Sequence, residues 1–224
     1  VVATDDERIA EAVRNFGGEV AMTRTDHPSG TDRIAEVARL FPQAERIINV
    51  QGDEPLISPG LIDDLARRMN AEPSVKMITA ASPCRDEAKL DDPNIVKVVL
   101  DAAGRALYFT RASVPFWRDA PTPGTLPSEP APLRHVGLYA YTPQALTLYS
   151  SLATGQLEQI EGLEQLRFLE HGHKIAAVEV TAPGAALSVR PLEAGGEVVG
   201  INSQIFSNSG GYMGVSFAIP IEVA

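Results

Sequence analysis

An acidic turn follows a short apolar segment near residue 50. Residues 47–50 are mostly apolar and predict a buried strand, and Asp53 lies in the turn that begins after Gln51. In open α/β sheets, ligands bind beyond the carboxyl ends of the strands, and Mg²⁺ is usually held by one or two carboxylates together with nucleotide phosphates. Asp53 is therefore a candidate Mg²⁺ ligand. The same segment also favours a plain turn, because Gly, Asp and Pro are common turn formers, so both alternatives stay open at this point.

The elements around this turn alternate between strand and helix. Short apolar segments alternate with segments in which apolar residues recur at helical spacing. This alternation indicates βαβ units and a mainly parallel sheet, hence an α/β fold. Two later apolar segments joined by a tight turn with a Gly predict a β-hairpin inserted on this core. The predicted strands are residues 1–3, 19–22, 46–50, 75–80 and 136–141, the hairpin is 95–100 with 106–109, and the main helices are 31–40, 59–69 and 158–170.

The composition narrows the functional classes. The chain of 224 residues has a formal net charge of −10, which argues against nonspecific nucleic-acid binding because such binding needs Lys and Arg to neutralise phosphates. An anionic substrate would need a local basic pocket or a metal ion. No apolar segment reaches the roughly 18 residues of a membrane helix, and the first residues lack the pattern of a signal peptide. Cys84 is the only cysteine, so an intrachain disulfide is excluded. The lack of disulfides is consistent with a protein of the reducing cytoplasm.

The composition changes near residue 185. From there charges become sparse and β-branched residues alternate with Gly and Ser, which predicts a β-rich tail with a hairpin turn at 207–211. The tail resembles the end of an HtrA-type serine protease domain, so we divide the chain into 1–185 and 186–224. Ser209 lies in a sequence similar to the nucleophile motif of these proteases. In that family, however, the nucleophile comes before the strand pair, whereas Ser209 comes after the strand. The His and Asp segments that would activate a serine nucleophile are also missing. A protease fragment is therefore the weakest alternative.

Several motifs occur in the order typical of one enzyme family. Together they resemble the CMP-Kdo synthetases (3-deoxy-manno-octulosonate cytidylyltransferases) over roughly residues 1–185. This resemblance implies a nucleotidyltransferase-like sheet with helices on both faces and the hairpin insertion. The matching motifs are residues 27–33, 51–55, 94–99, 106–111, 134–141 and 163–167.

The resemblance also implies a reaction and its nucleotide site. The anomeric hydroxyl of 3-deoxy-manno-octulosonate (Kdo) would attack the α-phosphate of CTP and release pyrophosphate, with Mg²⁺ organising the phosphates. Asp53 would be the catalytic metal ligand, with Gln51 beside the nucleotide. Ser29, Gly30 and Arg33 would line the cytosine and ribose side, where Gly permits close backbone approach and Arg supplies fixed donors.

Kdo is a carboxylate with many hydroxyl groups, so its site should combine a cation with neutral and acidic hydrogen-bonding groups. By family position, the residues that match this description are Arg111, His135, Tyr139, Glu164 and Gln165. Each also has a structural alternative. Arg111 could cap the hairpin, His135 and Tyr139 could be core residues of one strand face, and Glu164 with Arg167 could be an i,i+3 helix pair.

The chain departs from the family pattern at two places. We expect the first strand and its phosphate-binding loop to lie before Val1, and the second metal carboxylate is missing from its expected position after Gly184. This predicts a cytidylyltransferase of impaired activity, with a noncatalytic sugar-acid-binding remnant as the main alternative. By family resemblance, we also expect a cytoplasmic homodimer that acts in lipopolysaccharide precursor synthesis, without membrane or nucleic-acid partners.

Overall fold

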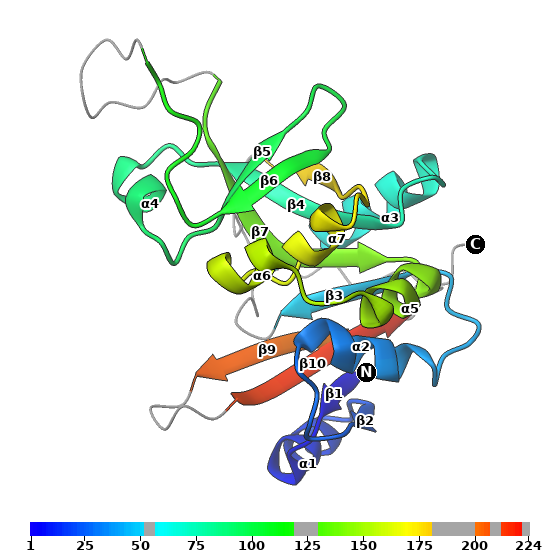
Figure 1. Cartoon of the computed structure of the whole chain (residues 1–224). Helices are drawn as coiled ribbons and strands as arrows, with labels where there is room; N and C mark the ends of the chain where they lie inside the picture. The colour runs from blue at the N-terminus through cyan, green and yellow to red at the C-terminus, as the bar shows by residue number, and fades with distance from the viewer. Residues whose placement is uncertain (52–56, 119–129, 181–199, 207–211, 221–224) are drawn as a thin grey trace.

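A computed structural model describes residues 1–51, 57–118, 130–180, 200–206 and 212–220, the last two ranges as backbone only (Figure 1). The described strands form one sheet around which the helices pack. The strands are β1 Val2–Thr4, β2 Val20–Met22, β3 Ile47–Gln51, β4 Met77–Pro83, β5 Lys97–Leu100, β6 Ala106–Thr110, β7 Leu133–Tyr141, β8 Ala176–Glu179, β9 Gly200–Phe206 and β10 Tyr212–Pro220.

The sheet has the order β2-β1-β10-β9-β3-β7-β4-β8, with the β5–β6 hairpin attached to β7. The α/β class is confirmed, but the prediction of a mainly parallel sheet is wrong. Among the described strands, the pairs β1–β2, β3–β9 and β4–β8 are parallel, and the remaining pairs are antiparallel. The reason is that β7 runs antiparallel between β3 and β4, and that β10 runs antiparallel to β1, β3 and β9.

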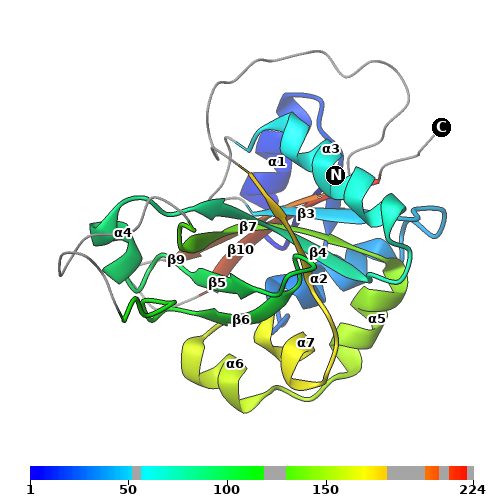
Figure 2. The same ribbon diagram turned by 90° about the horizontal axis from the view of Figure 1, so that it is seen from above.

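Helices cover both faces of the sheet, as predicted. In Figure 2, α1 and α3 lie on one side of the sheet, and α2, α5, α6 and α7 lie on the other. The described helices are α1 Glu7–Asn15, α2 Gly30–Ala38, α3 Pro59–Ala71, α4 Glu87–Asp91, α5 Pro143–Ser151, α6 Gln156–Glu161 and α7 Leu166–Glu170.

The predicted helix over 158–170 is two short helices, α6 and α7. Gly162 ends α6 with φ 62° and ψ 42°, a left-handed conformation that Gly adopts without steric cost. The four residues after α6 then form a turn before α7 begins at Leu166. This break turns residues 162–165 towards the sheet instead of continuing them around one helix.

The predicted hairpin is confirmed, because β5 and β6 pair antiparallel with Val98 opposite Phe109. The backbone of the tail also forms an antiparallel pair, β9 and β10. These two strands lie in the same sheet as the rest of the chain, because β10 pairs with β1 and β9 pairs with β3. Ser209 lies outside the described residues.

The main core lies between the sheet and its helices. Ile47 and Ile48 of β3, Leu65 of α3 and Phe168 of α7 are buried in one continuous apolar cluster. Residues 47–50 of β3 are buried and Gln51 at its carboxyl end is half-buried, so the strand runs from the core to the edge of the described structure.

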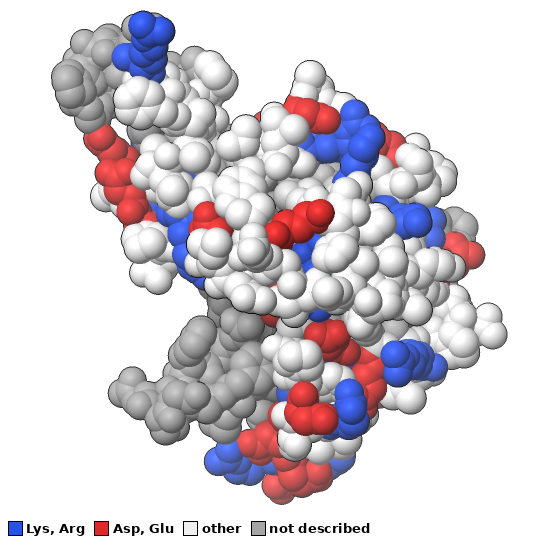
Figure 3. All heavy atoms as spheres, viewed as in Figure 1, with Lys and Arg blue, Asp and Glu red and all other residues white. Residues whose placement is uncertain are grey.

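The outer surface carries mixed charges. On the described part of the face seen in Figure 3, Lys and Arg are interspersed with Asp and Glu and form no continuous basic area. Within the described ranges, every helix is too short or too polar to cross a membrane.

Candidate functional site

A cavity of about 320 Å³ lies where the end of β3, the strand β7 and the turn between α6 and α7 meet. Parts of the chain that are far apart in sequence meet here because β7 pairs with both β3 and β4. The cavity brings together six of the predicted site residues, namely Gln51, Arg111, His135, Tyr139, Glu164 and Gln165. The sugar-acid set predicted from the sequence is therefore one spatial cluster.

A bulge in β7 shapes one wall of the cavity. Thr79 pairs with Tyr139, but the next β4 residue, Ala80, pairs with Val136, so β7 carries two extra residues at Gly137 and Leu138. Bulges bend a strand and redirect its side chains, often beside active sites. A Cβ atom added at Gly137 would lie 3.4 Å from the Cγ atom of Gln51. Gly137 therefore allows the bulged strand to lie close to the end of β3.

Two arginines give the cavity its positive charge. Arg111 donates from Nε to the Glu161 carbonyl at 2.7 Å and from Nη1 to the Pro93 carbonyl at 2.9 Å. Arg134 donates from Nε to Ser82 Oγ at 3.0 Å. Neither guanidinium forms an ion pair with a described residue, and each has five N–H groups. Both therefore retain N–H donors for an anionic ligand, while the Glu161 carboxylate, which accepts from the Arg111 backbone N–H at 2.9 Å, partly offsets the charge of Arg111.

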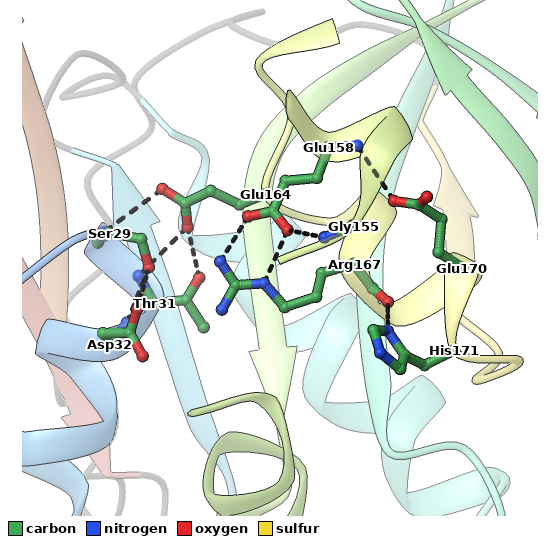
Figure 4. Close-up of polar contacts among 10 residues, drawn as sticks. Ser29, Thr31, Asp32, Gly155, Glu158, Glu164, Arg167, Glu170 and His171 are labelled. Atoms are coloured by element: carbon green, nitrogen blue, oxygen red, sulfur yellow. Dashed lines mark hydrogen bonds and ion pairs between the residues drawn. The ribbon is translucent and has the colours of Figure 1, made fainter. Parts of the chain in front are cut away.

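Glu164 lies at the N-terminus of helix α2. Its carboxylate accepts a hydrogen bond from Thr31 Oγ1 at 2.8 Å and longer bonds, both 3.4 Å, from the backbone N–H groups of Gly30 and Thr31 (Figure 4). Burial raises the pKa of Glu164, and the bonds from Thr31 and Gly30 oppose that increase. A carboxylate at a helix N-terminus is also favoured by the helix dipole. Glu164 is thus a positioned acceptor at the cavity wall.

The turn that carries Glu164 and Gln165 is anchored by a buried ion pair. Arg167 donates from Nε and Nη2 to the Glu158 carboxylate at 2.8 and 2.5 Å, and its guanidinium lies 4.3 Å from the centre of the Tyr149 ring. The alternative of an i,i+3 pair between Glu164 and Arg167 is therefore wrong. The break at Gly162 separates the two side chains, and each has a different partner (Figure 4).

Aromatic residues form the least polar part of the wall. His135 lies 5.3 Å from the Tyr139 ring, and Tyr139 stacks on Tyr141 at 6.0 Å. Burial lowers the pKa of His135 to about 3 and raises the pKa values of Tyr139 and Tyr141 above their ordinary range. These three side chains are consequently neutral near pH 7 and act as hydrogen-bonding groups rather than charges.

The predicted nucleotide-side residues lie next to this cavity, but they do not all face it. Ser29 caps α2 by accepting from the Asp32 N–H at 3.2 Å, and Gly30 contributes its N–H to Glu164. Arg33 is fully buried and donates to Asp5 at 3.1 Å and to Thr23 at 2.5 Å. In the described structure Arg33 therefore ties α2 to the segments after β1 and β2. Asp53 lies outside the described residues.

Several residues of the cavity wall were not predicted. Those with a polar side chain, together with Gly137 of the bulge, are Thr31, Asn94, Arg134, Gly137, Tyr141 and Tyr149. Arg134 directly precedes His135, and neighbouring residues of a strand normally face opposite sides of a sheet, so strand periodicity assigns only one of them to a site. The motif containing both residues was the only signal that could have identified Arg134.

The sheet order and the charged cavity beside the strand ends define a nucleotidyltransferase-like α/β protein. Comparison with known proteins makes the class more specific: the chain belongs to the CMP-Kdo synthetase family of cytidylyltransferases, as predicted. The sequence model of the family described as "Cytidylyltransferase" matches residues 1–175. The match covers β1 to α7 and ends just before β8.

Two relatives support this assignment. The chain is 49% identical over 191 residues to a 3-deoxy-manno-octulosonate cytidylyltransferase of Methylibium petroleiphilum, covering 82% of this chain and 72% of that protein. It is also similar to a solved structure of a CMP:2-keto-3-deoxy-manno-octonic acid synthetase complexed with CTP. That match has a TM-score of 0.74 and 40% identity and covers 83% of this chain and 73% of the other.

Proposed function

We propose that this chain carries the site for transfer of a cytidylyl group from CTP to Kdo, which yields CMP-Kdo and pyrophosphate. One observation carries the proposal: a single cavity combines two arginine side chains that form no ion pair among the described residues with several neutral hydrogen-bonding side chains. Such a set suits a ligand that is both a carboxylate and a polyol. The Methylibium relative, which bears the name of this activity, supports the choice of substrate.

The sugar acid would be bound by charge at one end and by hydrogen bonds along its length. Arg111 and Arg134 would pair with the carboxylate, since guanidinium groups match the geometry of a carboxylate. His135, Tyr139 and Gln165 would bind hydroxyl groups. Glu164 would accept from a further hydroxyl, while Thr31 holds its carboxylate in place.

The nucleotide would lie between the start of α2 and the end of β3. Gln51 reaches the cavity from the carboxyl end of β3, and Asp53 follows two positions later. The described residues contain no group of three side chains that could hold a metal ion. Mg²⁺ would therefore be held by Asp53 and the phosphates of CTP, which is a usual ligand set for this ion, and it would neutralise the charge on those phosphates.

In this arrangement the protein mainly positions the two substrates. The bond between the anomeric oxygen and the α-phosphorus would form while the bond to the departing pyrophosphate breaks. Holding both reactants in one geometry lowers the entropic part of the barrier. Homodimeric assembly and a cytoplasmic location remain proposals that follow from the family relationship.

The test is to measure Kdo binding by calorimetry and pyrophosphate release with CTP, Mg²⁺ and Kdo. Replacing Arg134 by Met removes a charge-assisted hydrogen bond, which is worth about 1.5–3 kcal/mol. We expect the dissociation constant for Kdo to rise by roughly 10- to 100-fold, with little change for CTP. Arg39→Met is the matched control, because Arg39 is exposed and follows α2 on the surface.

The outcomes separate the alternatives. Kdo binding together with pyrophosphate release supports the proposed transfer. Kdo binding without release of pyrophosphate favours the noncatalytic sugar-acid-binding protein. Absence of Kdo binding in the unmodified chain, or equal effects of Arg134→Met and Arg39→Met, would refute the assignment of this cavity.

A further inference from the structure

Thr79 lies behind the cavity wall, in the middle of strand β4. It is fully buried and pairs with Tyr139 at the position where the bulge of β7 begins. Its hydroxyl group meets three polar atoms of β7: His135 Nε2 at 2.8 Å, the Leu138 carbonyl at 2.8 Å and the Val136 carbonyl at 3.3 Å. One buried hydroxyl thus connects the bulged backbone to the imidazole of the candidate site.

The protons of this cluster can be counted. Thr79 Oγ1 and the Leu138 carbonyl oxygen lie 2.8 Å apart, and two oxygen atoms at this distance require a hydrogen atom between them. A carbonyl oxygen only accepts, so this hydrogen is the single hydroxyl hydrogen of Thr79. Thr79 Oγ1 has then only lone pairs to offer to His135. The contact of 2.8 Å with His135 Nε2 is a hydrogen bond only if the imidazole donates it.

We propose that Thr79 is a positioning residue for the sugar-acid site, because it holds His135 as the tautomer with hydrogen on Nε2 and leaves Nδ1 as an acceptor for a ligand hydroxyl. This inference rests on the proposed function of the cavity. The ring itself is held in place by Phe109, whose ring meets it edge-on at 5.1 Å and 80°, and by Tyr139 at 5.3 Å. Thr79 does not line the cavity, so its effect passes through His135.

This assignment separates the task of His135 from that of the arginines. The low pKa of His135, about 3, keeps the imidazole neutral at ordinary pH, so it offers a lone pair instead of a charge. Arg111 and Arg134 supply the cations for the carboxylate of the sugar acid. A neutral acceptor beside these cations would select for a hydroxyl donor at a defined position of the ligand. The opposite tautomer would present a donor there and would meet that hydroxyl less well.

The first measurement is the tautomer of His135 in the ligand-free protein. Nitrogen-15 NMR distinguishes protonated from unprotonated imidazole nitrogens, and the chain has only four histidines. His135→Gln identifies the signal by its loss. We expect Nε2 to be protonated and Nδ1 to be unprotonated from pH 6 to 8. Protonation on Nδ1 would overturn the proposal without the use of any variant or ligand.

The second measurement compares Thr79→Val with Thr79→Ser. Val has the shape of Thr without the hydroxyl, whereas Ser retains it. We expect Thr79→Val to give a mixture of tautomers and to weaken Kdo binding by roughly 10-fold, the loss of about one hydrogen bond, with CTP binding changed less than 2-fold. Thr79→Ser should restore the tautomer and most of the affinity. Thr147→Val is the control, because it removes an exposed hydroxyl that donates a hydrogen bond to the Pro143 carbonyl. It should change neither the His135 tautomer nor the affinity for Kdo.

Failure of this inference is distinguishable from failure of the proposed function. If the unmodified protein binds Kdo but Thr79→Val keeps both tautomer and affinity, Thr79 has no positioning role. If the unmodified protein binds no Kdo, the proposed function is refuted and the ligand part of this inference is refuted with it. The tautomer part is then still decided by the spectrum alone.

Discussion

The buried pair between Glu158 and Arg167 provides the sharpest test of how the candidate site is held. Their side chains are only 9% and 8% exposed, and two hydrogen bonds of 2.8 and 2.5 Å join them. The hydrogen bonds that Arg167 donates to the Glu158 carboxylate raise the pKa of Arg167. Glu158→Gln keeps the shape of the side chain but removes the charge, so Arg167 stays buried and ionised without its counter-ion.

The expected cost follows from that burial. Removing one partner of a buried ion pair costs about 3–5 kcal/mol, because the other charge remains in a medium of low polarity. The contact of Arg167 with the Tyr149 ring is present with and without the Glu158 charge, so it does not change this difference. We therefore expect Glu158→Gln to lower the free energy of unfolding by about 3–5 kcal/mol. Replacing both residues by Leu and Met should recover most of this loss, since such apolar replacements are often neutral.

Urea denaturation followed by circular dichroism measures these differences. Glu7→Gln is the matched control, because Glu7 and Arg14 form an ion pair at 2.6 Å with 69% and 52% of their side chains exposed. An exposed pair contributes about 0–1 kcal/mol. If Glu158→Gln costs no more than Glu7→Gln, the pair does not anchor the turn between α6 and α7, and our account of how Glu164 and Gln165 are positioned is wrong.

Three further predictions concern pH, backbone and metal. The pKa of His135 falls from 6.5 to about 3 on folding, so the unfolded chain binds a proton between these values that the folded protein does not, and stability falls as the pH decreases through this range. His135→Gln should remove that part of the pH dependence, which is at most about 1.4 kcal/mol per pH unit, in denaturation curves at pH 4–7. Gly162→Ala should destabilise by about 1 kcal/mol because φ is +62° there, whereas Gly60→Ala within α3 should be neutral or stabilising, and thermal unfolding compares the two. Asp53→Asn and chelation by EDTA should each abolish Mg²⁺-dependent pyrophosphate release while Kdo binding persists, and loss of Kdo binding as well would contradict a purely metal-binding role.

Regular elements were predictable because each depends on local periodicity. The hairpin of β5 and β6 and the helix α3 follow from apolar spacing and Gly or Pro at their ends. The direction of β7 was not predictable, since a strand's periodicity is the same in a parallel and an antiparallel pair. The break of the helix at Gly162 had a visible signal, a Gly inside the helical segment, but periodicity alone did not reveal it.

The candidate site was predicted only through the family resemblance. Composition indicated that an anionic ligand would need a local basic pocket, and the cavity has two arginines, Arg111 and Arg134, against one carboxylate, Glu164. The sequence alone does not identify the arginines that line the cavity, because their position depends on strand pairing over long distances in the chain. Arg134 of β7, for example, pairs with Lys97 of β5. Arg33 shows the converse limit: a charged residue within a motif can be a buried structural anchor, as its bonds to Asp5 and Thr23 demonstrate.

The parts of the fold that depart from regular structure are the parts that build the cavity. The bulge at Gly137 and Leu138 brings β7 against Gln51, and the left-handed turn at Gly162 directs Glu164 to the start of α2. Regular strands and helices would have been simpler to fold, so these departures are expected where a site requires them. The acidic segment after β3 lies outside the described residues, but Gln51, two positions before Asp53, borders this cavity. The place of Gln51 at the cavity is the structural support for our proposal that Asp53 binds the metal.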